Sequence, residues 1–186
     1  MKVKLTNNVK LNFFRDRIGV LIGKKGEIKQ FLEGEFGVNL VIDSATGQII
    51  LKNKDSDIEK LLKAKEFLKA IEYGFSPITA QKLLSDEQNL RIIDLTDHVK
   101  SDKDLSRIKG RIIGGKGKTR QIIEETSDVS LSIYRSYISL IGTYDDIIMA
   151  GGALSLLIKG APHKTVYNRL YNERTKRKME KRVLWL

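Results

Sequence analysis

The apolar and polar positions of this 186-residue chain change period several times from the N-terminus onward. Alternation predicts one or two strands within residues 2–14, with a turn at Asn7-Asn8. Helical spacing then predicts helices over 15–22 and 27–36, alternation predicts a strand hairpin over 38–43 and 48–52, and a capping box at Ser56-x-x-Glu59 opens a helix that ends at Tyr73-Gly74. The predicted order is β-α-α-β-β-α.

The same order recurs in the second half of the chain. The predicted elements are a strand over 90–95, helices over 102–113 and 118–126, a hairpin over 129–134 and 136–141, and a helix over 145–159 that opens at Thr143-x-x-Asp146. A shift of 91 positions places Gly23 on Gly114, Gly26 on Gly117 and Val38 on Val129. A register kept over so many residues indicates an internal duplication.

The duplication predicts an α+β protein of two similar domains. We expect a first domain over 1–76, a linker with a short helix starting at Pro77 over 77–88, a second domain over 89–160 and a basic helical extension over 161–186. Pro77 suits the first position of a helix because its missing N–H needs no partner there.

Each copy carries a Gly-x-x-Gly turn between its first two helices. The first turn is Gly23-Lys24-Lys25-Gly26 and the second is Gly114-Gly115-Lys116-Gly117. Glycine allows positive φ and has no Cβ, so the main chain of such a turn can approach a ligand closely. The next helix directs its unpaired N–H groups the same way. A lysine inside each turn favours an anionic ligand over a purely structural turn.

Positive charge is concentrated in two stretches of a chain whose formal charge is +11. Residues 105–123 contain no acid and six cations, namely Arg107, Lys109, Arg111, Lys116, Lys118 and Arg120. The tail, 163–186, contains eight cations against Glu173 and Glu180. This distribution indicates a polyanionic partner near the second turn and the tail.

Several classes of protein are disfavoured. The chain has no cysteine, which excludes disulfides and thiolate sites. The N-terminus does not look like a signal peptide, and the apolar run 147–158 is too short to span a bilayer, so we expect a cytoplasmic protein without membrane contact. Asp94, Asp97 and His98 are typical of a solvated turn, so no metal or cofactor is expected.

A nucleotide-binding P-loop is matched only in part. Gly110 to Lys116 fits Gly-x-x-x-x-Gly-Lys, but Gly117 follows where Ser or Thr would hold Mg²⁺. In the other frame, which ends in Lys118-Thr119, Ile112 stands in place of the first glycine. No catalytic set of nucleophile and base can be assembled, so we expect no enzyme activity.

The paired turns, with Ile22 and Ile113 before them, resemble the type I KH domain. The resemblance implies two tandem KH domains, each with a three-stranded antiparallel sheet packed on three helices, whose turns clamp about four nucleotides of single-stranded RNA. Thr119 departs from the pattern, which usually has an aliphatic residue there. The implied apolar groove walls are Ile18, Leu21, Ile28 and Leu40 in the first copy and Ile112, Ile122, Leu131 and Ile133 in the second. Arg135, in the second hairpin turn, is a further candidate for base contact.

Within the KH proteins, the chain resembles the archaeal relatives of the partner-of-Nob ribosome-assembly factors. The residues that carry this likeness are 111–120, 138–142, Ala150-Gly151-Gly152-Ala153 and the basic tail 167–182. The resemblance implies a monomer that binds the 3′ region of small-subunit rRNA during maturation and meets an endonuclease or another assembly protein there. Two rivals stay open: a general or transcription-coupled RNA-binding module, and a nucleotide-dependent enzyme.

The basic tail has two interpretations. Its cations could follow RNA phosphates along a helix. Alternatively, Leu170, Tyr171, Val183, Leu184 and Trp185 could dock the tail on its own domain or on another protein.

Overall fold

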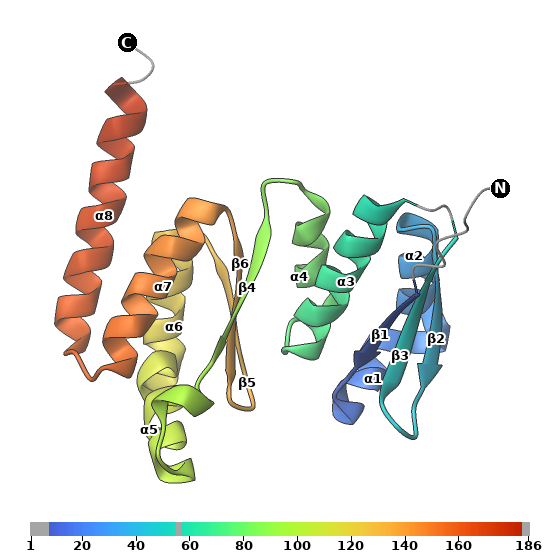
Figure 1. Cartoon of the computed structure of the whole chain (residues 1–186). Helices are drawn as coiled ribbons and strands as arrows, with labels where there is room; N and C mark the ends of the chain where they lie inside the picture. Colours follow the sequence, from blue (N-terminus) through green and yellow to red (C-terminus); the bar gives the residue numbers. More distant parts are fainter. Residues whose placement is uncertain (1–7, 55–56, 184–186) are drawn as a thin grey trace. The chain divides into compact units, whose positions relative to one another are not determined.

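The protein is described by a computed structural model over residues 8–54 and 57–183, with the backbone alone for 181–183. The chain divides into two compact units that meet between Ser85 and Asp86, and each combines helices with a three-stranded antiparallel sheet (Figure 1). The predicted mixture of helices and antiparallel sheets is therefore confirmed.

The first unit follows the predicted order of elements. Its strands are β1 (Asn8–Asn12), β2 (Val38–Asp43) and β3 (Gln48–Asn53), and its helices are α1 (Arg15–Ile22), η1 (Lys24–Gly26), α2 (Glu27–Glu35), α3 (Ile58–Glu72), α4 (Pro77–Ala80) and η2 (Gln81–Leu84). The strand order is β1-β3-β2, because β3 pairs with both neighbours. The segment α4–η2 packs on α3.

Two local predictions need correction in the first unit. Asn8 begins β1 and is not part of a turn, while Asn7 lies outside the described residues. The expected capping residue Ser56 also lies outside them. The N-cap of α3 is Asp57, whose side chain accepts from the amides of Glu59 at 3.0 Å and Lys60 at 3.2 Å. An aspartate satisfies these helix-end donors as well as a serine does.

The second unit repeats this architecture and adds a long helix. Its strands are β4 (Asn89–Asp94), β5 (Ser130–Tyr134) and β6 (Tyr137–Gly142), and its helices are η3 (Thr96–His98), α5 (Asp102–Ile113), η4 (Gly115–Gly117), α6 (Lys118–Ser127), α7 (Tyr144–Ile158) and α8 (His163–Val183). The strand order is β4-β6-β5. As predicted, Thr143 caps α7 by accepting from the Asp146 amide.

An equivalent hydrogen bond ties the second helix to the edge strand in both units. Glu33 Oε1 of α2 accepts from the Leu40 amide of β2 at 2.8 Å, and Glu124 Oε1 of α6 accepts from the Leu131 amide of β5 at 2.8 Å. Both residues of each pair are related by the 91-position shift. In each unit this hydrogen bond therefore fixes the spacing between the edge strand and the helix that follows the glycine turn.

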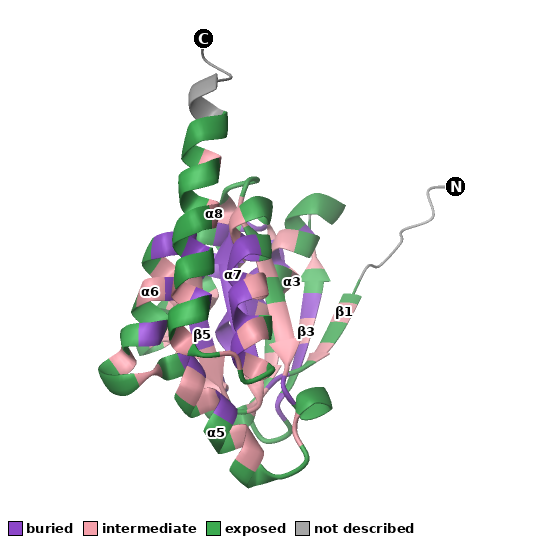
Figure 2. Ribbon diagram, turned by 90° about the vertical axis from the view of Figure 1, so that its left-hand side faces the viewer, coloured by how far each residue is buried: buried purple, intermediate pink, exposed green. Residues whose placement is uncertain are grey.

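The helix α8 docks on the second unit through its first turns. Val166 and Leu170 are buried in the core of that unit, and α8 contacts both α6 and α7. The guanidinium of Arg169 lies beside Gly152 of α7, where a Cβ would make an ordinary contact with it at 3.5 Å. Figure 2 shows the outer face of α8 exposed. Docking of the tail on its own domain is thus confirmed for Leu170, whereas Tyr171 is exposed. The side chains of Val183, Leu184 and Trp185, which were also expected to dock, lie outside the described residues.

Glu72, the last residue of α3, predicts an unusual dependence of stability on pH. Only 9% of this residue is exposed, and burial raises the pKa of its carboxyl from 4.5 to about 7, partly countered by Lys69. The folded state therefore favours the protonated acid. The free energy of unfolding therefore falls as pH rises from about 4.5 to 7. Above pH 7 the whole cost of ionising the buried carboxyl opposes folding.

Replacing Glu72 with Gln should remove this penalty. We expect the free energy of unfolding at pH 8 to increase by about 2 kcal/mol. A pKa shift corresponds to ~1.4 kcal/mol for each unit, and the expected gain is smaller than the shift of Glu72 implies because the surroundings of a buried charge relax. At pH 4 the two proteins should have equal stability. Urea denaturation at both pH values measures the difference, and an equal change at pH 4 and pH 8 would point to packing and not to ionisation.

Candidate nucleic-acid interface

The second glycine turn has positive φ at three of its four residues. Gly114 has φ 73°, Lys116 φ 52° and Gly117 φ 79°. A Cβ at Gly114 would lie 2.2 Å from Thr119 Oγ1, so glycine is required there on two grounds. At Gly115 and Gly117 a Cβ would meet no atom within 4 Å, so the outer side of the turn is open.

The turn is held by two hydrogen bonds of its own and leaves its two central residues exposed. Gly114 N–H donates to Gly110 O at 2.8 Å, and Gly117 N–H donates to Gly114 O at 3.2 Å. Gly115 and Lys116, between them, are both exposed. The turn can therefore present the main chain of these two residues, together with the Lys116 ammonium, to an anion.

The first turn has the same conformation. Gly23, Lys25 and Gly26 have φ of 73°, 52° and 82°, and Lys24 and Lys25 are exposed. Gly23 and Gly26 donate to Gly19 O and Gly23 O, as their counterparts in the second turn do. Both turns lie on the surface of their own unit, as predicted.

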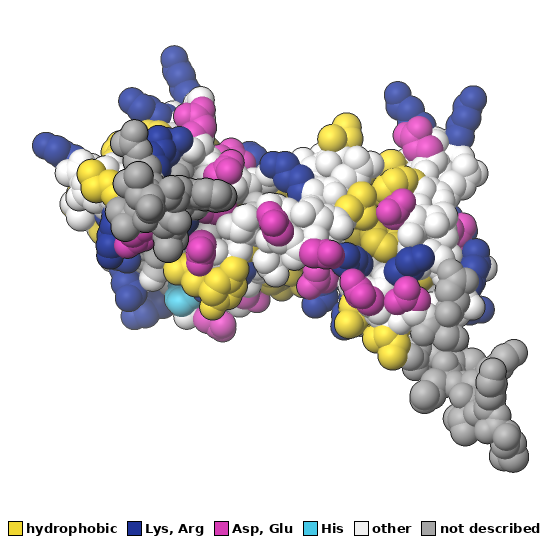
Figure 3. Space-filling view, turned by 90° about the horizontal axis from the view of Figure 1, so that it is seen from above, with side chains coloured by type: hydrophobic (Ala, Val, Ile, Leu, Met, Phe, Trp, Pro, Cys, Tyr) yellow, Lys and Arg dark blue, Asp and Glu magenta, His cyan; other side chains and the backbone are white. Residues whose placement is uncertain are grey.

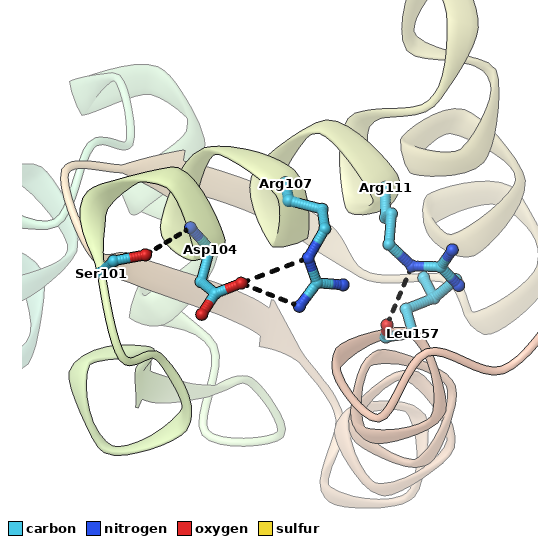
Figure 4. A network of polar contacts seen from close by, with 5 residues as sticks. All are labelled: Ser101, Asp104, Arg107, Arg111 and Leu157. Atoms are coloured by element: carbon cyan, nitrogen blue, oxygen red, sulfur yellow. Dashed lines mark hydrogen bonds and ion pairs between the residues drawn. The ribbon is translucent and has the colours of Figure 1, made fainter.

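The predicted cations around the second turn do not behave alike. Lys116 and Lys118 are exposed, whereas Arg120 pairs with Glu124 at 3.3 Å along α6. Arg111 Nε donates to Leu157 O of α7 at 3.2 Å (Figure 4). Its Nη2 donates to Ala161 O, just after α7, at 2.5 Å. Arg111 was expected to bind phosphate. Its guanidinium instead joins α5 to the end of α7, because those helix-end carbonyls need donors.

The apolar groove walls also need correction. Ile112 and Leu131 are fully buried in the core and cannot contact bases; the same holds in the first unit for Ile18, Leu21 and Leu40, whereas Ile28 is partly exposed. Ile122 and Ile133 are partly exposed and can contribute.

Sequence reasoning missed Ile113, which is 39% exposed at the end of α5. The helical period contained the signal: Ile108 and Ile112 share the buried face, so Ile113 points away from it.

Arg135 lies in the turn between β5 and β6. It is exposed with φ 50°, and its guanidinium lies 5.7 Å from the centroid of the Tyr134 ring. A guanidinium near an aromatic ring in an exposed turn suits contact with a base.

Two side chains of α8 form hydrogen bonds with residues on either side of the second turn. The buried Thr119 shares a 2.8 Å hydrogen bond between its Oγ1 and the hydroxyl of Tyr167. His163 Nε2 lies 2.9 Å from Arg111 O and must be the donor, since a carbonyl only accepts. Thr119 therefore replaces the usual aliphatic residue because its neighbour from α8 offers a polar partner.

The acidic and histidine residues near β4 form a turn. Asp94 Oδ1 accepts from the Thr96 amide at 2.9 Å and the Thr96 hydroxyl at 2.8 Å, and Asp97 and His98 are exposed. Within the described ranges no group of three or more metal-binding side chains is found. In the same ranges, no helix combines the length and apolar character of a membrane span.

Comparison with known proteins places this geometry in a family. A model described as a eukaryotic-type KH domain (KH-domain type I) matches residues 89–175. A KH domain-containing protein of Methanocaldococcus jannaschii is 40% identical over 172 residues, which cover 92% of this chain and 76% of that protein. The RNA-binding protein PNO1 of Oryzias latipes is 38% identical over 117 residues, 61% of this chain and 48% of that protein.

Solved structures agree with these matches. Dim2p from Pyrococcus horikoshii has a TM-score of 0.83 and 40% identity, covering 89% of this chain and 99% of that one. A complex of a/eIF2alpha, aDim2p and rRNA from the same organism contains a chain with a TM-score of 0.87 and 38% identity, covering 94% and 97%. The present chain therefore belongs to the family of KH-domain proteins that includes archaeal Dim2p and the PNO1 proteins.

Proposed function

We propose that this protein is a non-enzymatic, single-stranded RNA-binding protein of two KH domains that binds the 3′ region of small-subunit rRNA during ribosome maturation. The observation that carries the proposal is the second turn, where the exposed residues Gly115 and Lys116 lie next to the exposed side chain of Lys118. Such a turn suits the sugar-phosphate backbone of an unpaired strand.

The family supports the choice of RNA. Relatives are named RNA-binding protein PNO1 and pre-rRNA-processing protein pno1, and an archaeal Dim2p occurs in a complex with rRNA. The concentration of positive charge around the second turn agrees with a polyanionic partner. Figure 3 displays lysine and arginine side chains projecting from several sides of the unit that carries α8.

The first unit is proposed to be a KH domain as well. Its β-α-α-β-β-α order, its turn geometry and its Glu33–Leu40 tie all match the second unit in register. We assign it the weaker RNA site, because Asp16 and Glu27 lie on the helices that flank its turn. The proposed domain limits are 1–76 and 89–160, with 77–88 as the linker and 161–186 as the extension.

Protein partners are part of the proposal. The exposed distal part of α8 is suited to meet an assembly protein or a maturation endonuclease, since Arg174 and Lys178 are exposed there while Arg177 is bound to Asp146 at 2.9 Å. The complex that contains a/eIF2alpha makes that protein a second candidate. The chain itself is proposed to be a cytoplasmic monomer.

Crosslinking in cells tests the proposed function. The tagged full chain, crosslinked to RNA and sequenced, should recover precursor small-subunit rRNA with contacts grouped near its 3′ end. A variant with Asp at Gly115 and Lys116 serves as the control for the turn. Recovery of diverse transcripts without precursor rRNA would instead favour a general RNA-binding module, and Mg²⁺-dependent ATP turnover by the pure protein would favour an enzyme.

A further inference from the structure

A hollow of about 430 Å³ lies beside the second turn, between α5 and the start of α8. Three cations line it: Arg107 and Arg111 from α5 and Lys118 from the start of α6. His163 and Tyr167 of α8 form the opposite wall. No carboxylate is among the described residues that line the hollow, so its surface is positive.

The lining groups divide into those used by the fold and those available to a ligand. Arg111, Thr119 and His163 are engaged in the hydrogen bonds described above. Arg107 donates two long hydrogen bonds, each 3.4 Å, from Nε and Nη2 to Asp104 Oδ1, yet its side chain is 55% exposed. Arg107 and Arg111 lie one turn apart and point to the same side of α5 (Figure 4). Arg107, which stays largely exposed, and Lys118 are therefore placed to receive an anion beside Gly115.

The first unit lacks this arrangement. By the shift of 91 positions, Asp16 is equivalent to Arg107 and Glu27 is equivalent to Lys118, so the first unit has acids where the second has these two cations. The third helix of the first unit is followed by the short segment α4–η2, whereas α7 is followed by the 21-residue helix α8. Positive lining and helical wall thus occur together, in the unit whose turn carries the greater charge.

We propose that this hollow is a second phosphate site, which binds the backbone of a nucleotide flanking those held by the turn. The inference rests on the proposed RNA binding and extends it. A strand whose phosphates contact Gly115 and Lys116 continues past the turn, and the hollow shares Gly115 with that path. Arg107 and Lys118 contact the flanking phosphate, and α8 limits how the strand leaves. The site therefore lengthens the RNA that the second unit recognises.

Arg107→Asp tests the site, because it gives the second unit the aspartate that the first unit has at the equivalent position, Asp16. Affinity is measured for a tetranucleotide, which matches the length held by one turn, and for an RNA of about twelve nucleotides from the 3′ region of small-subunit rRNA. We expect the longer RNA to bind about five- to tenfold more weakly and the tetranucleotide to bind as before. The slope of log K against log salt should become shallower by about 0.7 for each phosphate that the protein no longer neutralises.

Lys103→Asp is the matched control, since Lys103 is exposed on the same helix but does not line the hollow. It makes the same change in charge and should affect both RNAs little. Equal losses for both RNAs in Arg107→Asp, or equal losses in the two variants, would overturn the site, and so would unchanged binding by Arg107→Asp. Circular dichroism confirms that each variant is folded.

The two proposals fail in different ways. If Gly115→Asp/Lys116→Asp abolishes binding of both RNAs while Arg107→Asp changes neither, the turn site stands and the hollow does not bind phosphate. If the unaltered protein binds neither RNA, both proposals are wrong.

Discussion

The double variant Gly115→Asp/Lys116→Asp should lose about 100-fold in RNA affinity while keeping its fold. Two carboxylates replace one ammonium, which changes the charge at the turn by three units. Each unit is worth about 1 kcal/mol at 4 Å from a phosphate in a water-like medium, and each 1.4 kcal/mol is tenfold in affinity. The carboxylates would also lie on the exposed main chain that approaches the strand.

The structure explains why stability should be retained. A Cβ at Gly115 meets no atom within 4 Å, and position 116 already holds a side chain at φ 52°. Aspartate tolerates this left-handed conformation better than most residues do. We therefore expect the melting temperature to stay within about 2 °C of the original, since surface changes of this kind are usually within ±0.5 kcal/mol.

Lys24→Asp/Lys25→Asp in the first turn is the matched comparison. This variant changes the charge by four units, one more than Gly115→Asp/Lys116→Asp does. A smaller loss of affinity than in that variant therefore cannot be explained by the size of the charge change. We expect a loss of about tenfold or less, because Asp16 and Glu27 already weaken the field around that turn. Fluorescence anisotropy with one labelled RNA measures both variants. A larger loss from the first turn would reverse our ranking of the two sites.

Gly114→Ala should destabilise the second unit by about 2–6 kcal/mol. Alanine at φ 73° and ψ 172° lies in a region that is essentially restricted to glycine, which costs about 1–3 kcal/mol. Its Cβ would also lie 2.2 Å from Thr119 Oγ1 and 2.8 Å from Thr119 N, which adds an overpacking cost of about 1–3 kcal/mol. Relief of the clash requires Thr119 to move. Because Thr119 bonds Tyr167 and lies in the first turn of α6, its movement also shifts the turn.

Gly117→Ala separates strain from collision. Gly117 has φ 79°, but a Cβ there meets nothing within 4 Å, so only the conformational cost of about 1–2 kcal/mol applies. Urea denaturation followed by circular dichroism gives both free energies of unfolding, and RNA affinity is measured under conditions where each variant is folded. If the two variants prove equally stable, the contact with Thr119 does not constrain the turn.

Much of the fold was accessible from the sequence because its signals are local or repeated. Apolar periodicity predicted α1, α5 and the two hairpins to within a residue or two, since strands and helices expose one face to water. The shift of 91 positions aligned the two turns, whose glycines the structure places at matching positive φ. The helical period of α5 also assigns Ile112 to the core with Ile108 and Ile113 to the surface, whereas the resemblance to KH domains implied a groove wall at Ile112.

Periodicity, the internal repeat and the glycine spacing were sufficient to predict the elements, the duplication and the position of the two cationic turns. The roles of individual side chains near those turns depend on how the helices pack. The carbonyls of Leu157 and Ala161 are held by Arg111, yet their counterparts Ile71 and Phe75 are held by Arg17, which the register pairs with Ile108. Partners some fifty residues apart meet only when helices pack, and any arginine on the right helical face can supply the donors. Local pattern therefore located the turns, whereas packing assigned Arg111 to the fold, joined Thr119 to Tyr167 and formed the hollow beside Arg107.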